Sequence, residues 1–100
     1  MAKTAFSIYM DYKKTMNQAN ELERVARDLK SLANSNFQSS ISRLNSNWTG
    51  EAASAYIKKA NKLKSDMENS ANSISKTSSA LKTIAITTYK AEMAALALLG

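Results

Sequence analysis

The stretch Asn45-Ser46-Asn47-Trp48-Thr49-Gly50-Glu51 stands at the middle of this 100-residue chain and decides how it folds. Gly50 is one of only two glycines, and the chain contains no proline. Glycine reaches positive φ without a Cβ clash, so it is the cheapest residue at which a helix can end in a sharp turn. The three polar residues that open the stretch favour helix ends, because their side chains compete for backbone hydrogen bonds. We therefore predict a turn over about residues 45–50, pinned by Trp48.

Apolar residues at helical spacing lead into this turn and away from it. Before the turn, steps of three and four from Leu22 onward mark one face of a helix, which we expect to span about residues 4–44. A second helix is expected over about residues 51–97, with Thr49 as its N-cap and Glu51 at its positive end. Two heptad series follow this second helix: Ala60, Met67, Ile74, Leu81 and Thr88, and a companion series Leu63, Ser70, Thr77, Ile84 and Ala91.

One part of the first helix is rich in weak helix formers. Asn34-Ser35-Asn36 and Gln38-Ser39-Ser40 have low helix propensity, while Phe37 and Ile41 continue the apolar stripe through them. We interpret this segment as a soft spot or kink, with a true break as the less favoured alternative.

The composition predicts an all-α fold, a two-helix antiparallel hairpin that dimerises into a four-helix bundle. Two helices alone bury too little apolar surface, and a chain without cysteine or histidine lacks disulfides and the usual metal ligands. Oligomerisation remains, as a homodimer or as a heterodimer with a related helical protein. The residues predicted to pack in the core or the dimer are Leu22, Val25, Leu29, Leu32, Phe37, Ile41, Leu44, Leu63, Met67, Ile74, Leu81 and Ile84.

Enzymatic activity is not expected. The chain offers no imidazole base and no thiolate nucleophile. Its eight carboxylates are scattered, and one internal glycine cannot build a glycine-rich phosphate loop. We therefore predict no catalytic residue, no metal site and no cofactor.

The net charge of +6 is compatible with two classes of partner, nucleic acid and acidic protein. Lys58, Lys59, Lys62 and Lys64 form a basic strip on the second helix. Such runs are usually solvated faces, and no aromatic interleaving or recognition-helix pattern accompanies this one, so specific nucleic-acid binding is the less favoured interpretation. The charge equally suits an acidic protein partner.

The whole chain resembles the WXG family (Trp-X-Gly, hundred-residue, Esx-type) of type VII secretion substrates, through Trp48-Thr49-Gly50 at the centre of a 100-residue helical sequence. The resemblance implies association with a secretion ATPase through a C-terminal signal, a tyrosine followed after three residues by an acidic residue. Tyr89 stands in that region, but Met93 holds the expected acidic position and Glu92 comes one residue early. Positions three apart on a helix are neighbours, so Tyr89 and Glu92 can still share a face.

The ends of the chain bear on its route out of the cell. Charges at Asp11, Lys13 and Lys14 interrupt the first apolar run, so no cleaved N-terminal signal is expected. The apolar segment 93–99 is shorter than the roughly 20 residues that cross a bilayer, so no transmembrane segment is expected either. We therefore expect the protein to be cytoplasmic before export and to be secreted without a cleaved signal.

Three functional hypotheses follow. The first is a helical-hairpin protein that is exported by, or acts within, a type VII system. The second is a dedicated partner or targeting adaptor for a larger type VII toxin, and the third is a small basic nucleic-acid-binding protein. If the hairpin prediction holds, Trp48→Ala should loosen it and Gly50→Val should strain its turn.

Overall fold

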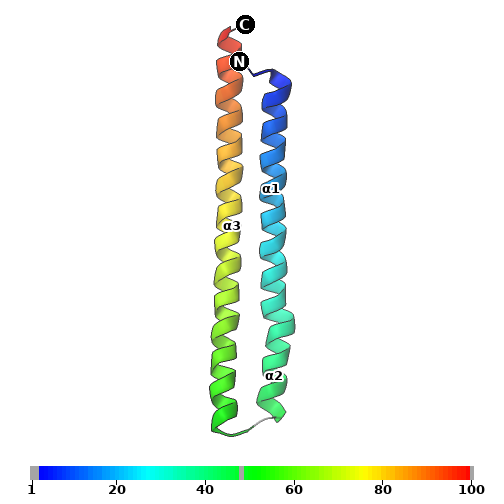
Figure 1. The fold of residues 1–100 in the computed structure, drawn as a ribbon, viewed down its shortest axis with the longest axis vertical. Coiled ribbons are helices and arrows are strands. Elements are labelled where there is room, and N and C mark those ends of the chain that lie inside the picture. Colours follow the sequence, from blue (N-terminus) through cyan, green and yellow to red (C-terminus); the bar gives the residue numbers. More distant parts are fainter. Residues whose placement is uncertain (1–2, 48, 100) are drawn as a thin grey trace. The chain divides into compact units, whose positions relative to one another are not determined.

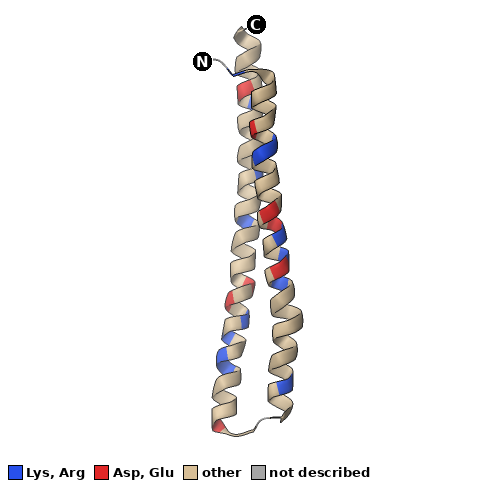
Figure 2. Ribbon diagram, turned by 45° about the vertical axis from the view of Figure 1, so that its right-hand side comes forward, with Lys and Arg blue, Asp and Glu red and all other residues tan. Residues whose placement is uncertain are grey.

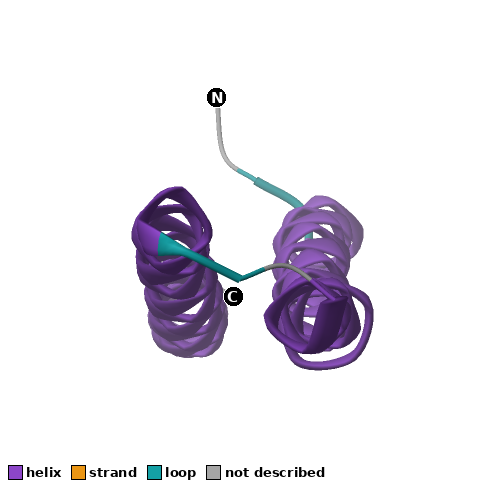
Figure 3. Cartoon of the chain, turned by 90° about the horizontal axis from the view of Figure 1, so that it is seen from below, coloured by secondary structure: helices purple, strands orange, loops and turns teal. Residues whose placement is uncertain are grey.

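The computed structural model describes residues 3–47 and 49–99, which are helical apart from short loops at the start of the chain and at the turn (Figure 3). The elements are α1 (Ala5–Ser31), the π-helix η1 (Leu32–Phe37), α2 (Gln38–Asn47) and α3 (Glu51–Leu99) (Figure 1). Because α1, η1 and α2 follow one another without a gap, the described residues form two long helical arms. The all-α prediction is confirmed.

These residues fall into two compact units. The terminal unit combines Met1–Glu23 with Ser75–Gly100, and the turn unit is Arg24–Ile74. Both arms contribute to both units. Along the described part of the chain, no helix is long and apolar enough to cross a membrane.

A reciprocal cap fixes the start of α1. The Ser7 backbone N–H donates to Thr4 Oγ1 at 3.1 Å, and the Thr4 N–H donates to Ser7 Oγ at 3.1 Å. The Ile8 N–H donates to the Thr4 carbonyl at 3.0 Å, which is the first bond of the helical ladder. Thr4 is therefore the N-cap, and two backbone donors that a helix start leaves unpaired are satisfied.

The predicted soft spot lies within and next to η1, where the helix widens instead of breaking. Ala33 and Ile41 are both buried, and Leu29 and Phe37 are both half-buried, yet each pair is eight residues apart. In a regular helix, eight residues would rotate the second member by about 80° from the first. A π-helical turn accommodates one extra residue. The π-helix therefore returns Phe37 and Ile41 to the buried face.

The turn unit is a helical hairpin around Gly50. Gly50 has φ +108°, a value that L side chains rarely adopt, and the Ser54 N–H donates to its carbonyl at 3.0 Å. That bond opens the ladder of α3, so Gly50, and not the predicted Thr49, occupies the N-cap position. Trp48, predicted to pin the turn, lies outside the described residues. Alanine and isoleucine side chains are buried between the two arms of this unit: Ala26, Ala33, Ile41, Ala53 and Ala71.

The terminal unit pairs the start of α1 with the end of α3 in antiparallel fashion. Lys3 contacts Glu92, Tyr12 contacts Tyr89, and Ala19 contacts Ser78, so residue numbers rise along one helix and fall along the other. The fully buried Ser78 donates its hydroxyl proton to the Ala19 carbonyl at 2.7 Å. A hydroxyl on so short a side chain reaches the opposite backbone only where small residues let the two helices approach closely.

The inner seam of α3 differs from the predicted companion series. Ala71, Ser78 and Ala85 are buried at seven-residue spacing, whereas Leu63 and Ile84 are 52% and 57% exposed. Small side chains occupy the closest approach, and the larger ones of the companion series lie on the exposed side. The first predicted series lies between these two faces, so Met67, Ile74 and Leu81 are half-buried.

Candidate protein-interaction site

Tyr89 and Glu92, the signal-like pair, lie one turn apart on α3 in the terminal unit, and both are half-buried. The Tyr89 ring packs against the Tyr12 ring with centroids 5.0 Å apart and planes tilted by 43°. Such tilted aromatic contacts are favourable beyond the area they bury. The Glu92 carboxylate accepts a hydrogen bond from Lys3 Nζ at 2.9 Å. Both members of the pair are thus held by residues from the start of the chain.

The Lys3 ammonium stands between two carboxylates. Besides its contact with Glu92, Lys3 Nζ lies 3.4 Å from Asp11 Oδ2. The hydrogen bond to Glu92, followed by that to Asp11, raises the pKa of Lys3 above the ordinary value of 10.5. Opposite charges at this distance favour the charged form of an amine. Lys3 therefore remains a cation throughout the neutral pH range.

Two hollows in the terminal unit share Lys3, Ile8 and Glu92 as lining residues. The first, about 270 Å³, continues along the helix pair towards Ile84 and Tyr89. The second, about 190 Å³, continues towards the C-terminal end of α3, with Ala95, Leu96 and Leu99 in its lining. The Lys3–Glu92 ion pair thus lines both a hollow with mixed polar and apolar walls and a mainly apolar one.

Exposed apolar side chains follow α3 at multiples of seven residues. The turn unit exposes Tyr56 and Leu63, and the terminal unit exposes Ile84 and Leu98, the last of these to 90%. The sequence of α3 has no charged residue after Glu92, and the C-terminal end of this helix is tan in Figure 2. Extending the predicted companion series one heptad in each direction would have found Tyr56 and Leu98.

The other predicted packing residues vary in their burial. Ile41 is buried, and Val25 and Leu32 are among the exposed large side chains. The remaining ones are half-buried: Leu22, Leu29, Phe37, Leu44, Met67, Ile74 and Leu81. Apolar side chains therefore remain accessible on both arms of the turn unit.

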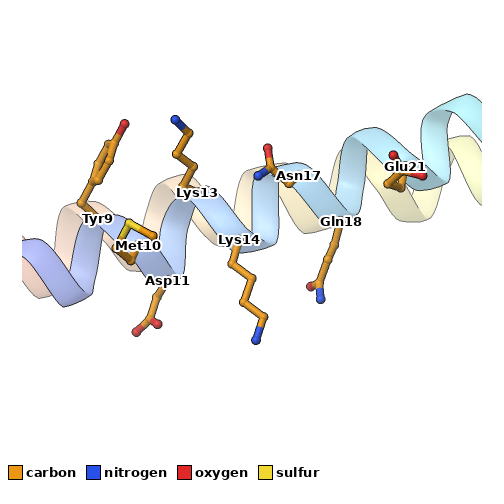
Figure 4. Close-up of a pocket in the computed structure, with 8 residues that line it drawn as sticks. All are labelled: Tyr9, Met10, Asp11, Lys13, Lys14, Asn17, Gln18 and Glu21. Carbon is orange, nitrogen blue, oxygen red and sulfur yellow. The ribbon is translucent and has the colours of Figure 1, made fainter.

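The largest hollow described here does not bring functional groups together. A hollow of about 660 Å³ lies against α1 alone, and Figure 4 shows Tyr9 and Lys13 pointing to one side of the helix while Asp11, Lys14 and Gln18 point to the other. Within the described ranges, no group of three or more acidic residues could hold a metal ion.

The basic strip lies in the turn unit. Lys58, Lys59 and Lys62 are exposed, and Lys64 Nζ lies 3.4 Å from Glu68 Oε1 one helical turn away. An ion pair within one helix adds only a few tenths of a kcal/mol, about 0.3–0.5. This arrangement is typical of a solvated helix face.

Comparison with protein families gives a match over most of the chain. The model of the WXG100 family, described as proteins of 100 residues with WXG, matches residues 7–93. No curated protein and no solved structure shows a significant match to the chain.

Proposed function

Because the chain belongs to the WXG100 family, we propose that it is a non-catalytic helical protein exported by, or acting within, a type VII secretion system. Members of this family are small helical proteins associated with type VII secretion; they are not known as enzymes, and they typically pair with related helical proteins. The function of this chain is then recognition through helix–helix association, with a C-terminal segment read by the secretion ATPase.

The exposed apolar side chains of α3 are the observation that carries this proposal. Leu63 and Ile84 each leave about half of a large aliphatic side chain in water. Covering that remainder contributes on the order of 1 kcal/mol for each residue. Residues seven apart lie on one face of a paired helix, so a second helical chain can cover them in register. A four-helix bundle buries such a stripe.

The net charge favours a particular kind of partner. Two copies of a chain with charge +6 repel each other at low ionic strength, whereas an acidic helical chain is attracted and docks faster. We therefore favour a related acidic protein as the partner over a second copy. An adaptor for a larger toxin is the same arrangement, with the acidic helices belonging to the toxin.

Two isoleucines on α3 provide a matched test of the association face. Ile84 and Ile86 are both exposed in the terminal unit, but two residues rotate a helix by about 200°, so they face different directions. Ile84→Glu should weaken partner binding by about ten-fold or more, because it removes apolar burial and forces a charge into the interface. Ile86→Glu should leave binding unchanged. The measurement is affinity purification from the source cell, with bound chains identified by mass, followed by light scattering of the purified complex.

Several outcomes would count against the association. A folded, monodisperse monomer at micromolar concentration that captures no helical partner from the source cell would remove its basis. Unchanged binding by Ile84→Glu would place the interface elsewhere, and equal loss in both variants would show that the face of Ile84 is not selectively involved.

Tyr89 and Glu92 supply the second part of the proposal. We expect Tyr89→Ala to block export while the helices stay folded, because the ring is the large recognisable group of the segment. Tyr9→Ala removes a ring from the exposed face of α1 and serves as the control. Wild-type amounts of the Tyr89 variant in the culture supernatant would reduce Tyr89 to a packing residue.

A further inference from the structure

We propose that Lys3 gates the Tyr89–Glu92 site, and that the secretion ATPase that reads this segment brings its own cationic side chain to Glu92. This inference rests on the proposed function, because it assigns regulation and ligand chemistry to the same pair. In the closed arrangement Lys3 Nζ is 2.9 Å from the Glu92 carboxylate, and Tyr12 packs against Tyr89. A partner that recognises Glu92 must therefore displace Lys3.

The local structure lets Lys3 move without unfolding a helix. Lys3 precedes the Thr4 cap, and α1 begins only at Ala5. Its ammonium is already within 3.4 Å of Asp11, so on leaving Glu92 it keeps a second carboxylate. The lysine side chain is about half exposed, and solvent-exposed ion pairs are weak. Lys3 can therefore leave Glu92 at low cost while it stays beside Asp11.

The released site has a defined chemistry. The two hollows that meet at the Lys3–Glu92 pair have volumes of about 270 Å³ and 190 Å³. Apolar residues contribute to their walls, with Ile84 at the first and Leu96 and Leu99 at the second. Withdrawal of Lys3 from Glu92 frees that carboxylate beside a mixed first hollow, which Asp11, Thr15 and Thr88 also line, and a mainly apolar second one. This site fits an arginine or lysine flanked by apolar side chains, and replacing one cation by another keeps Glu92 paired.

The gate predicts opposite effects for residues of one ion-pair cluster. Lys3→Met opens the site and should raise export about two- to five-fold, the range expected for loss of a surface ion pair. Asp11→Asn removes the alternative position of Lys3, which then stays on Glu92, so export should fall. Glu92→Gln breaks the same ion pair as Lys3→Met but also removes the group that the partner's cation needs, so export should fall again.

The experiment measures the ratio of supernatant to cell-bound protein in the source cell. Lys3→Arg keeps the ion pair and should behave as wild type, and Lys14→Met, an exposed lysine on α1 with no part in the site, is the matched control. Circular dichroism melting of each purified variant separates gating from folding. A purely structural role for the cluster would shift export and melting temperature in the same direction for Lys3→Met and Asp11→Asn.

The outcomes separate the gate from the function on which it rests. If export of the Tyr89→Ala variant is blocked while the Lys3→Met variant is exported at the wild-type level, the gating hypothesis is wrong and the proposed secretion signal stands. Reduced export of Lys3→Met would make Lys3 part of the docking surface and would also overturn the gate. If Tyr89→Ala is exported normally, the proposed signal fails, and the gate fails with it.

Discussion

Ser78 offers a sharp test of the close helix approach in the terminal unit. Ser78 and Ser79 are neighbours on α3, but Ser78 is fully buried against Ala19 whereas Ser79 is exposed. Replacing each by leucine makes the same chemical change in two environments. If the seam is as tight as the 2.7 Å hydrogen bond from Ser78 Oγ to the Ala19 carbonyl indicates, only Ser78→Leu should destabilise the protein.

The magnitude follows from three contributions. Loss of the interhelical hydrogen bond costs about 0.5–1.5 kcal/mol. Forcing extra carbon atoms into a filled seam costs about 1–3 kcal/mol. The better helix propensity of leucine returns a few tenths of a kcal/mol, roughly 0.3, at both positions. The net effect of Ser78→Leu is therefore a loss of about 1.5–4 kcal/mol in the free energy of unfolding.

Thermal unfolding followed by circular dichroism at 222 nm measures this difference. For a domain of this size, 1 kcal/mol corresponds to roughly 4–8 °C, so Ser78→Leu should lower Tm by roughly 6–32 °C. Ser79→Leu should leave Tm unchanged or slightly raised. All variants must be compared at one protein concentration, because association shifts apparent stability by mass action.

Two results would refute this reasoning. Equal melting temperatures for the two leucine variants would show that Ser78 is not confined between the helices. A Ser78→Ala variant as unstable as Ser78→Leu would show that the hydrogen bond, and not the narrow space, dominates. Alanine removes the hydroxyl but fits the seam, so its expected cost is no more than the hydrogen-bond contribution of about 1.5 kcal/mol.

Two further predictions concern the backbone. Gly50→Val should lower the free energy of unfolding by about 1–3 kcal/mol. The cost is backbone strain at φ +108° and not a steric clash, because no neighbouring atom would meet a Cβ there. Urea titration beside the exposed control Thr49→Val measures this loss, and equal unfolding midpoints for the two variants would contradict it. Deleting Ser35 should leave Tm unchanged or raised, because it restores seven-residue spacing between Ala33 and Ile41. Deleting Gln18 from a regular part of α1 should lower the free energy of unfolding by more than about 2 kcal/mol, because it rotates one helical segment by about 100° relative to the helix it packs against. Similar losses of stability for the two deletions would argue against the π-helical explanation.

The sequence was sufficient to predict two helical arms and a turn at Gly50, but residues 45–47, predicted as part of the turn, belong to α2. With no proline and one internal glycine, the chain has few points at which a helix can end cheaply, and Gly50 adopts the positive φ expected of it. The polar segment before the turn also predicted a local departure from regular helix. Its π-helical form depends on the eight-residue spacing of buried positions, which is visible only once Ala33 and Ile41 are known to face the same way.

The choice of inner face was decided by tertiary packing. Hydrophobicity favours Leu63 and Ile84 for the seam, but the structure buries Ala71, Ser78 and Ala85 and leaves the larger side chains exposed. Both choices satisfy a heptad repeat, so periodicity alone cannot distinguish them. Small residues permit the two helix backbones to approach closely. This close packing is stabilised by dispersion attraction between the helices.

The contacts around Tyr89 and Glu92 also combine a feature that the sequence predicts with one that only tertiary packing decides. Tyr89 and Glu92 are recognisable from their spacing, because neighbours on a helix are encoded locally. Their pairing with Tyr12 and Lys3 joins residues from opposite ends of the chain, and no local pattern specifies such a contact. It arises from the antiparallel pairing of the two helices in the terminal unit.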